Sequence, residues 1–201
     1  MEIPFYFDYA CPWAYMGAVR AEAHFNDLGV EIDFRPALLS IIRELPANPL
    51  PEDVKPPGLG PRKRDNMAND FRHWADLCGA EFHEDVRKSR PDPKLLTQGF
   101  LVAKAAGKSR AYHYPAYRAR WAEARDVADP SVVRELLSAA GLDGDEALEH
   151  AQSDEIRERV EASSREALER GVFGVPTLFV GNEMFWGNDH FELVRHYVQK
   201  A

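Results

Sequence analysis

Residues 5–17 read FYFDYACPWAYMG, and they predict a buried strand, a sharp turn and the start of a helix. The segment from Ile3 to Phe7 is apolar and aromatic, as in a central strand. Pro12 suits the first helical turn, because the missing N–H of a proline costs nothing there. Cys11 is therefore expected just before the helix, where free N–H groups and the helix dipole favour an anion. Such a place favours a thiolate, of Cys11 itself or of a ligand, although a free cysteine is often only a small buried apolar residue.

The composition narrows the class of protein. A chain of 201 residues can bury a sizeable core, as one domain or as one domain with an insertion. Its net charge of −8 argues against nucleic acid as a partner, and no apolar run approaches the roughly 18 residues of a membrane helix. No signal peptide pattern is present, and Cys11 and Cys78 are too few for a disulfide framework. We therefore expect a cytoplasmic protein without a membrane partner.

The two ends of the chain predict a small α/β unit. A helix over residues 12–28 with Gly29 as its C-cap, followed by a strand over 30–34, gives a parallel β–α–β crossover. Ser153 caps a helix that stops near Gly171. Residues 176–180 and 183–186 predict two strands joined by a two-residue turn, and Asp189 is expected to cap a last helix.

The middle of the chain has a different character. Six prolines between residues 46 and 61 predict a long loop, either a lid over a site or a plain surface linker. Residues 62–144 follow a helical pattern, and two apolar stripes are expected to pack in the core. We therefore predict an all-helical insertion over residues 44–152, between the two parts of the α/β domain, 1–43 and 153–201. The stripes consist of Met67, Phe71, Trp74 and Leu77, and of Tyr114, Tyr117 and Trp121.

The order βαβ followed by αββα, with Cys11 after the first strand, resembles the thioredoxin fold. The segment Gly174-Val175-Pro176-Thr177 strengthens the resemblance. In that fold a cis proline begins the third strand and faces the head of the first helix, and the residue before it offers its backbone to a thiol peptide. An ordinary trans proline at the start of a strand is the alternative.

Two motifs allow a closer match. The first is Phe-Asp-x-x-Cys-Pro-aromatic-x-Tyr at residues 7–15, and the second runs from Gly171 to Asp189. Together they resemble the 2-hydroxychromene-2-carboxylate isomerase family, which is grouped with the kappa-class glutathione transferases and lies beside the DsbA oxidoreductases. The likeness covers essentially the whole chain. Looser matches in the middle are Asn48-Pro49, Lys63, Met67, Asp70, Trp74-Ala75 and residues 124–130.

The resemblance implies a glutathione site and a substrate site. Cys11 stands where the family has a serine that hydrogen-bonds the glutathione sulfur, so it is the implied catalytic residue. The backbone of Val175, before Pro176, would pair with the cysteinyl part of glutathione. The γ-glutamyl end would be held by Trp186, Gly187, Asn188 and Asp189. The residues that would approach the thiol and the substrate, including a basic position for a substrate carboxylate, are Arg43, Asn48, Pro49 and Lys63. No metal ligand set is expected.

The implied chemistry is isomerisation of an unsaturated carboxylate by reversible addition of the glutathione thiol. Alternatives are a kappa-like transferase, a monothiol thiol–disulfide oxidoreductase that uses Cys11, and a thioredoxin-like module that only binds. A dithiol cycle is disfavoured, because Ala14 occupies the position of a resolving cysteine. Residues 82–85 read FHED where the family usually has Phe-Pro-x-Asn, which leaves the small-molecule substrate open. The resemblance also suggests a homodimer.

Overall fold

The computed structural model describes residues 1–43, 60–86 and 88–201. Within these ranges one sheet of four strands forms in the order β2-β1-β3-β4. Strands β1 and β2 are parallel, whereas β3 is antiparallel to β1 and β4 is antiparallel to β3. This topology confirms the predicted β–α–β unit at one end of the chain and the hairpin at the other. The strands are β1 Glu2–Phe7, β2 Glu31–Pro36, β3 Thr177–Val180 and β4 Glu183–Trp186.

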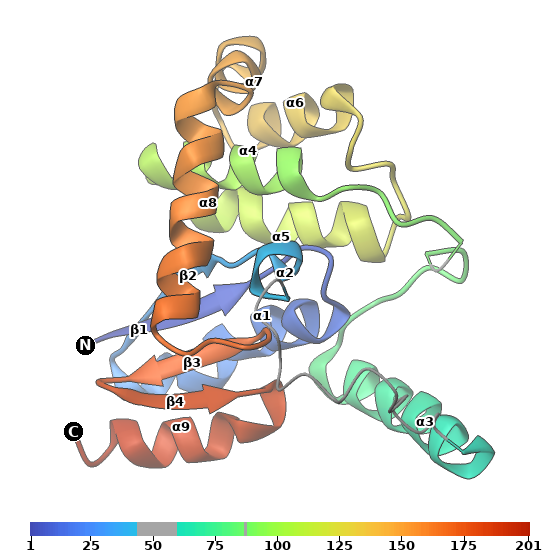
Figure 1. The fold of residues 1–201 in the computed structure, drawn as a ribbon, viewed down its shortest axis with the longest axis vertical. Helices are drawn as coiled ribbons and strands as arrows, with labels where there is room; N and C mark the ends of the chain where they lie inside the picture. The colour runs from blue at the N-terminus through green and yellow to red at the C-terminus, as the bar shows by residue number, and fades with distance from the viewer. Residues whose placement is uncertain (44–59, 87) are drawn as a thin grey trace, which may run out of the picture.

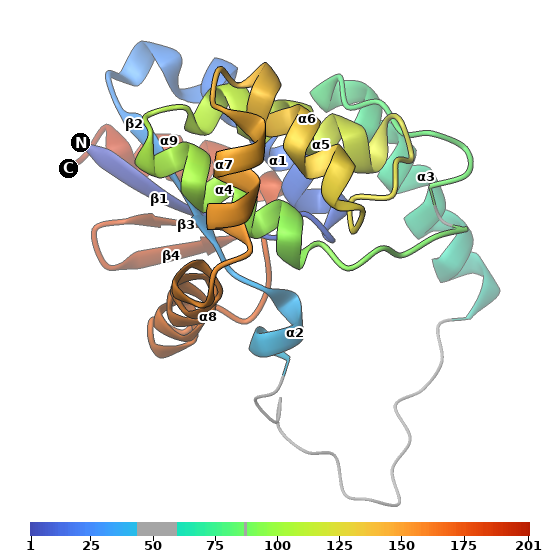
Figure 2. The ribbon, with the colours of Figure 1, turned by 90° about the horizontal axis from the view of Figure 1, so that it is seen from above.

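Helices cover both faces of the sheet (Figure 2). Helix α1 (Pro12–Phe25), which a 3₁₀ turn extends to Leu28, lies on one face with α9 (Phe191–Val198), and α8 (Asp154–Glu169) lies on the other. Neighbouring residues of a strand point to opposite faces. The ring of Phe5 therefore packs against Phe191 at 6.5 Å between centroids, while the hydroxyl of Tyr6 donates to Glu166 on α8 at 3.2 Å.

The middle of the chain is helical, as predicted. Figure 1 shows α4 to α7 gathered at one end of the molecule beside α8, and α3 projecting at the opposite end. A short helix, α2 (Leu39–Ile42), follows β2. The other helices are α3 Pro61–Cys78, α4 Lys94–Ala105, α5 Ser109–Trp121, α6 Pro130–Ala139 and α7 Gly144–Ala151. The division into an α/β domain and an insertion stays a prediction.

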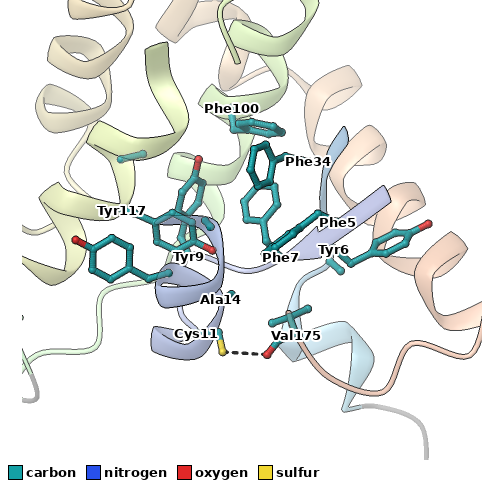
Figure 3. Packing of buried hydrophobic residues seen from close by; sticks show 14 of the residues in the cluster. Phe5, Tyr6, Phe7, Tyr9, Cys11, Ala14, Phe34, Phe100, Tyr117 and Val175 are labelled. Atoms are coloured by element: carbon teal, nitrogen blue, oxygen red, sulfur yellow. Dashed lines mark hydrogen bonds between the residues drawn. The ribbon is translucent and has the colours of Figure 1, made fainter. Parts of the chain in front are cut away.

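An aromatic cluster joins the helical region to the sheet (Figure 3). The ring of Phe7 at the end of β1 lies 4.9 Å from Phe100 on α4 and 4.5 Å from His113 on α5. Tyr117 and Trp121 on α5 are buried, which confirms the predicted inner face for these two residues, whereas Tyr114 is half-buried. Edge-to-face contacts of this kind add to the free energy of burial, at about 1 kcal/mol each. The strand that leads to Cys11 is therefore fixed from both sides.

The apolar stripe predicted on α3 is only partly buried. Met67 is 49% exposed and Leu77 is 66% exposed, so the expectation that both lie in the core is wrong. Phe71 and Trp74, between them, are half-buried, and the ring of Phe71 packs against Trp13 of α1 at 5.5 Å. Helix α3 projects from the body of the protein (Figure 1), so much of its surface remains open to solvent.

The last helix is not capped by Asp189, contrary to the prediction. The residue that precedes α9 is His190, and no side chain caps the helix. Asp189 instead lies inside a 3₁₀ turn, Asn188–His190, and its carboxylate is 3.1 Å from the ring nitrogen of His190. The chain turns early at Gly187, whose φ of 98° favours glycine, and the extra turn displaces the start of the helix.

Candidate active site

Cys11 is held at the head of α1 by its neighbours. It is the N-cap residue, with extended backbone, and Pro12 follows in the first helical turn, as predicted. The N–H of Cys11 donates to the carbonyl oxygen of Asp8 at 3.0 Å, and the carbonyl oxygen of Cys11 accepts from the N–H of Tyr15 at 3.1 Å. These two bonds close the turn between β1 and α1, which fixes the direction of the thiol.

The thiol faces the segment that precedes β3 (Figure 3). Its Sγ donates to the carbonyl oxygen of Val175 at 3.3 Å, and the peptide bond between Val175 and Pro176 is cis. Helix α1 approaches this segment closely at Gly17, where an added Cβ would lie 3.2 Å from Cγ of Pro176. The structure therefore brings residues from the two ends of the chain to one place, as the sequence predicted.

Burial keeps the Cys11 side chain in its thiol form. Burial raises the pKa of Cys11 to about 11, although the N–H groups of Ala14 and Trp13 at the helix start lower it. The negative charge of Asp8 raises the pKa further, and Arg43 lowers it. The expectation of a thiolate at this helix start therefore does not hold for Cys11 itself. A protonated thiol can donate a hydrogen bond, as it does to Val175.

The carboxylate of Asp8 joins α2 to the loop between β1 and α1, residues 8–11, which we call the catalytic loop because it carries the candidate catalytic residue Cys11. One oxygen accepts from the N–H of Ala10 at 2.8 Å, and the other accepts from the N–H of Leu39 at 2.7 Å. Asp8 is only 2% exposed, and burial raises its pKa while the two backbone bonds lower it. Buried carboxylates of this kind need such partners. Asp8 therefore sets the position of α2 relative to Cys11.

The hairpin β3–β4 brings the predicted γ-glutamyl residues beside Pro176. Trp186 pairs with Thr177 across the hairpin, and the N–H of Gly187 donates to the carbonyl oxygen of Pro176 at 2.9 Å. Trp186 is 49% exposed, and its ring lies 5.0 Å from that of Phe173. Its indole fits over Gly174, where an added Cβ would lie 2.7 Å from Nε1.

The two last residues of this group differ in exposure. Asn188 is buried; its side-chain amide nitrogen donates to Sγ of Cys78 at 3.9 Å, and its backbone carbonyl oxygen accepts from the guanidinium of Arg20 at 2.9 Å. Cys78 is buried as well. Asp189 is exposed, and one oxygen of its carboxylate lies 3.1 Å from Nδ1 of His190. Asn188 therefore fixes the turn, whereas Asp189 faces solvent.

A cleft of about 890 Å³ opens beside the loop that carries Cys11, with Ala10 and Pro12 in its wall. Its walls are the start of α1, helix α2, the N-terminal half of α3, residues 90–94 and the end of α5. Apolar side chains make up most of the described part of the lining, and basic side chains outnumber acidic ones there, although the whole chain is acidic. The basic ones are Arg43, Arg64, Arg90, Lys94 and Arg120, and the acidic ones are Asp8 and Asp92.

The residues predicted for the substrate lie in different places. Arg43 ends α2 and lines the cleft. Lys63 is exposed in the first turn of α3, and its neighbour Arg64 lines the cleft instead. Asn48 and Pro49 lie outside the described residues. Of this group, then, only Arg43 is seen beside the catalytic loop.

Sequence reasoning missed Arg120 and Trp121 as cleft residues. Both lie at the end of α5, and both line the cleft with Trp13. Trp121 Nε1 donates to the carbonyl oxygen of Tyr9 at 2.9 Å, which ties α5 to the catalytic loop. A signal was present, because Arg120 comes three residues after the buried Tyr117, at helical spacing on the inner face.

The described parts of the chain contain no group of three or more His, Cys, Asp or Glu side chains placed to hold a metal ion. In the same residues no helix combines the length and the apolarity that a membrane crossing needs.

Comparisons with known proteins agree with this geometry. The family model of the DSBA-like thioredoxin domain matches residues 2–199. The 2-hydroxychromene-2-carboxylate isomerase of Pseudomonas putida is 32% identical over 195 residues, which cover 94% of this chain and 90% of that protein. Glutathione S-transferase kappa 1 of Homo sapiens is 23% identical over 96% of this chain and 89% of its own length.

Among solved structures, one of 2-hydroxychromene-2-carboxylate isomerase superimposes with a TM-score of 0.79 at 27% identity. The match covers 100% of this chain and 95% of that one. The match thus includes the sheet, the catalytic loop and the helical region. The chain therefore belongs to the DSBA-like thioredoxin family, in which its relatives include 2-hydroxychromene-2-carboxylate isomerases and a kappa-class glutathione transferase.

Proposed function

We propose that this protein is a glutathione-dependent isomerase that resembles 2-hydroxychromene-2-carboxylate isomerase and acts on an unsaturated, aromatic-type carboxylate. The observation that carries the proposal is the position of the Cys11 thiol, which lies at the head of α1 and donates to the carbonyl oxygen of Val175. Glutathione, when bound, supplies the nucleophilic thiol that adds reversibly to the substrate and is regenerated. The chain's own residues bind, orient and hydrogen-bond the two small molecules.

Cys11 acts as a hydrogen-bond donor in this proposal. Its raised pKa keeps the proton on its own sulfur at neutral pH, so it is a poor nucleophile and can donate to a ligand thiolate. The N–H groups of Trp13 and Ala14, at the positive end of the helix dipole, favour a negative sulfur beside it. Together these groups lower the free energy of the thiolate that the reaction requires.

The residues present fit glutathione. Among the residues that the structure describes, the carbonyl oxygen of Val175 accepts only from the thiol of Cys11, a weak donor, so an amide N–H of the ligand can replace that thiol. The exposed carboxylate of Asp189 suits the ligand's ammonium group, and the indole of Trp186 gives an exposed apolar surface beside it. Pro176 and Gly187 hold the two strands of this wall together, and Asn188 positions the turn.

The substrate lies in the cleft beside the catalytic loop in this proposal. Arg43 takes part in binding its anionic group, and we keep Lys63, Asn48 and Pro49 as proposed neighbours of the thiol and the substrate. The basic lining of the cleft supports an anionic small molecule. Because the reaction needs reduced glutathione, we place the protein in a reducing compartment, the cytoplasm. A homodimer also remains a proposal.

A thiol–disulfide oxidoreductase is the main alternative, because the helix start lowers the pKa of Cys11 to some extent. A kappa-like transferase would use the same thiol site with a different substrate. In both transferase and isomerase, Cys11 only donates a hydrogen bond, and a serine can replace it. In the oxidoreductase, the sulfur of Cys11 itself forms the mixed disulfide with glutathione.

The deciding experiment measures isomerisation of 2-hydroxychromene-2-carboxylate by the purified chain, with and without glutathione. We expect activity only with glutathione, nearly full activity in Cys11→Ser, and a loss of about 10-fold or more in Cys11→Ala, because alanine cannot donate. Reduction of a glutathione mixed disulfide is measured in parallel. If Cys11→Ser abolishes that reduction and no isomerisation is seen, the oxidoreductase is correct and the proposal is wrong.

A further inference from the structure

Arg120 is a buried cation in the wall of the cleft. It lies in the last turn of α5, it is 5% exposed, and it lines the same cleft as Arg43 and Trp13. Its guanidinium lies 4.5 Å from the centroid of the Trp121 ring, so the plane of the charge is held by an aromatic face. Arginine is almost never buried to this extent unless an anion pairs with it.

No carboxylate pairs with Arg120 in the part of the chain that the structure describes. Its guanidinium donates to two backbone carbonyl oxygens, of Ser89 at 3.1 Å and of Val86 at 3.5 Å. The acidic residues of the described cleft lining are engaged elsewhere. Asp92 pairs with Lys94 at 3.6 Å, and Asp8 accepts the two backbone N–H groups of the catalytic loop and α2.

Within the described residues, the positive charge of the Arg120 guanidinium is therefore not balanced by a carboxylate. Burial lowers the pKa of Arg120, and no nearby group opposes that shift. A guanidinium carries five N–H donors, and the two carbonyl oxygens use only part of them. The remaining donors are therefore suited to the two oxygens of a carboxylate, which a guanidinium binds in a fork geometry.

We propose that Arg120 is a specificity-determining residue that binds the carboxylate of the substrate at the inner end of the cleft. The identity of the substrate in this proposal rests on the proposed function. The preference for a negatively charged ligand rests on Arg120 alone. It differs from the assignment of this role to Arg43, which is exposed at the end of α2. A buried cation discriminates an acid from a neutral analogue more strongly than an exposed one, because water screens it less.

In the alternative, Arg120 has a purely structural role, and its hydrogen bonds only hold the segment from Val86 to Ser89 against α5. The two roles differ in what a substitution changes. A structural arginine supports every ligand of the cleft equally, whereas a carboxylate-binding arginine supports only the anionic ones. The test therefore compares two ligands of the same shape, trans-cinnamate and trans-cinnamamide, which are an unsaturated aromatic acid and its neutral amide.

Isothermal titration of the full chain measures both ligands in the wild type and in Arg120→Met. We expect the wild type to bind cinnamate more tightly than cinnamamide. Arg120→Met should weaken the binding of cinnamate about 10- to 100-fold, which is the effect expected for the loss of a charged hydrogen bond. The binding of cinnamamide should not change. The matched control is Arg118→Met on the same helix, because Arg118 is exposed and pairs with Glu81 at 2.8 Å. This control should bind both ligands as the wild type does.

Several outcomes would overturn the proposal. These are equal binding of acid and amide by the wild type, no cinnamate binding at millimolar concentrations, or equal losses of both ligands in Arg120→Met. Loss of the preference in Arg43→Met but not in Arg120→Met would assign the carboxylate to Arg43 instead. If Arg120→Met does not fold, Arg120→Lys decides, since it keeps the charge and loses the fork. We expect Arg120→Lys to weaken the binding of cinnamate several-fold and to leave the binding of cinnamamide unchanged. Unchanged binding of cinnamate in this variant would overturn the proposal.

Failure of the proposed function is seen separately. The melting temperature of the wild type with and without glutathione reports on the thiol site beside Val175. A missing glutathione shift with an intact preference for cinnamate would reject the isomerase and retain the carboxylate site.

Discussion

Cys11 donates its thiol hydrogen to the carbonyl oxygen of Val175 at 3.3 Å, although 164 positions separate the two residues in the sequence. The bond joins the head of the first helix to the segment before the third strand. It also occupies the acceptor that a ligand amide would use. Free and ligand-bound Cys11 should therefore differ in their hydrogen-bond partner, and the chemistry of the thiol can be tested directly.

The reactivity of Cys11 should follow its raised pKa. With a pKa of about 11, only about one molecule in 10,000 carries the thiolate at pH 7, and that fraction rises about tenfold per pH unit. We expect alkylation by iodoacetamide, followed by mass spectrometry of the Cys11 peptide, to be far slower than that of free glutathione at pH 7. Fast alkylation with an inflection below pH 8 would show a stabilised thiolate and contradict the hydrogen-bond role.

Asp189→Asn should weaken the binding of glutathione modestly. Asp189 is exposed, so solvent screens its attraction to an ammonium group, and exposed ion pairs contribute about 0.2–1 kcal/mol. We expect the dissociation constant of glutathione, measured by calorimetry, to rise about two- to fivefold, and less at high salt. Asp145→Asn, an exposed acid on α7 that pairs with Arg134, is the matched control and should change nothing. An unchanged constant in Asp189→Asn would remove this residue from the γ-glutamyl site.

Gly174→Ala should displace Trp186. An added Cβ would lie 2.7 Å from the indole nitrogen, but the indole is half exposed and can turn away. We therefore expect a loss of less than about 1 kcal/mol in the free energy of unfolding, measured in urea, together with clearly weaker glutathione binding. A large loss of stability with normal affinity would mean that the indole is fixed by the fold and makes no contact with the ligand.

The buried His113 should make the protein sensitive to mild acid. Burial lowers its pKa to about 3, while an unfolded histidine titrates near 6.5. The unfolded chain therefore binds the proton more readily, so stability is full above pH 6.5 and falls as the pH drops from 6.5 towards 3. Because of His113 alone, the free energy of unfolding should be about 2 kcal/mol lower at pH 5 than at pH 7.5.

The measurement is urea unfolding at pH 7.5 and pH 5, in the wild type and in His113→Phe. The substitution leaves the hydroxyl of Tyr9, now 3.0 Å from Nδ1 of His113, without its partner, so we expect lower stability at pH 7.5. When the pH is lowered from 7.5 to 5, the free energy of unfolding of His113→Phe should fall by less than that of the wild type. Equal losses in both proteins would mean that other groups cause the acid sensitivity.

Local patterns predicted the parts of this fold that local physics controls. The turn at Cys11-Pro12 and the short hairpin at Gly181 follow from backbone preferences of a few neighbouring residues, and the structure confirms both. The stretch before Pro12 also identified the central strand, because both of its faces are covered by helices and its residues are apolar almost throughout.

What the sequence did not predict depends on contacts between distant segments. The exposure of Met67 and Leu77 follows from the way α3 projects, which its own amphipathic pattern does not contain. The raised pKa of Cys11 comes from burial by the far end of the chain, and it outweighs the helix start that the sequence does show. Arg120 was missed for the same reason, since its lack of a carboxylate partner in the described residues is visible only in three dimensions.

The two bonds of Asp8 have a consequence for the range of ligands. Because its two oxygens hold the backbone of Ala10 and of Leu39, the length of one short side chain fixes the spacing between the loop before Cys11 and the start of α2. A glutamate there would be one methylene longer and would push α2 outwards, carrying Arg43 away from the sulfur. A single substitution at this position is thus expected to change both the range of molecules that fit beside the sulfur and the surroundings of the thiol itself.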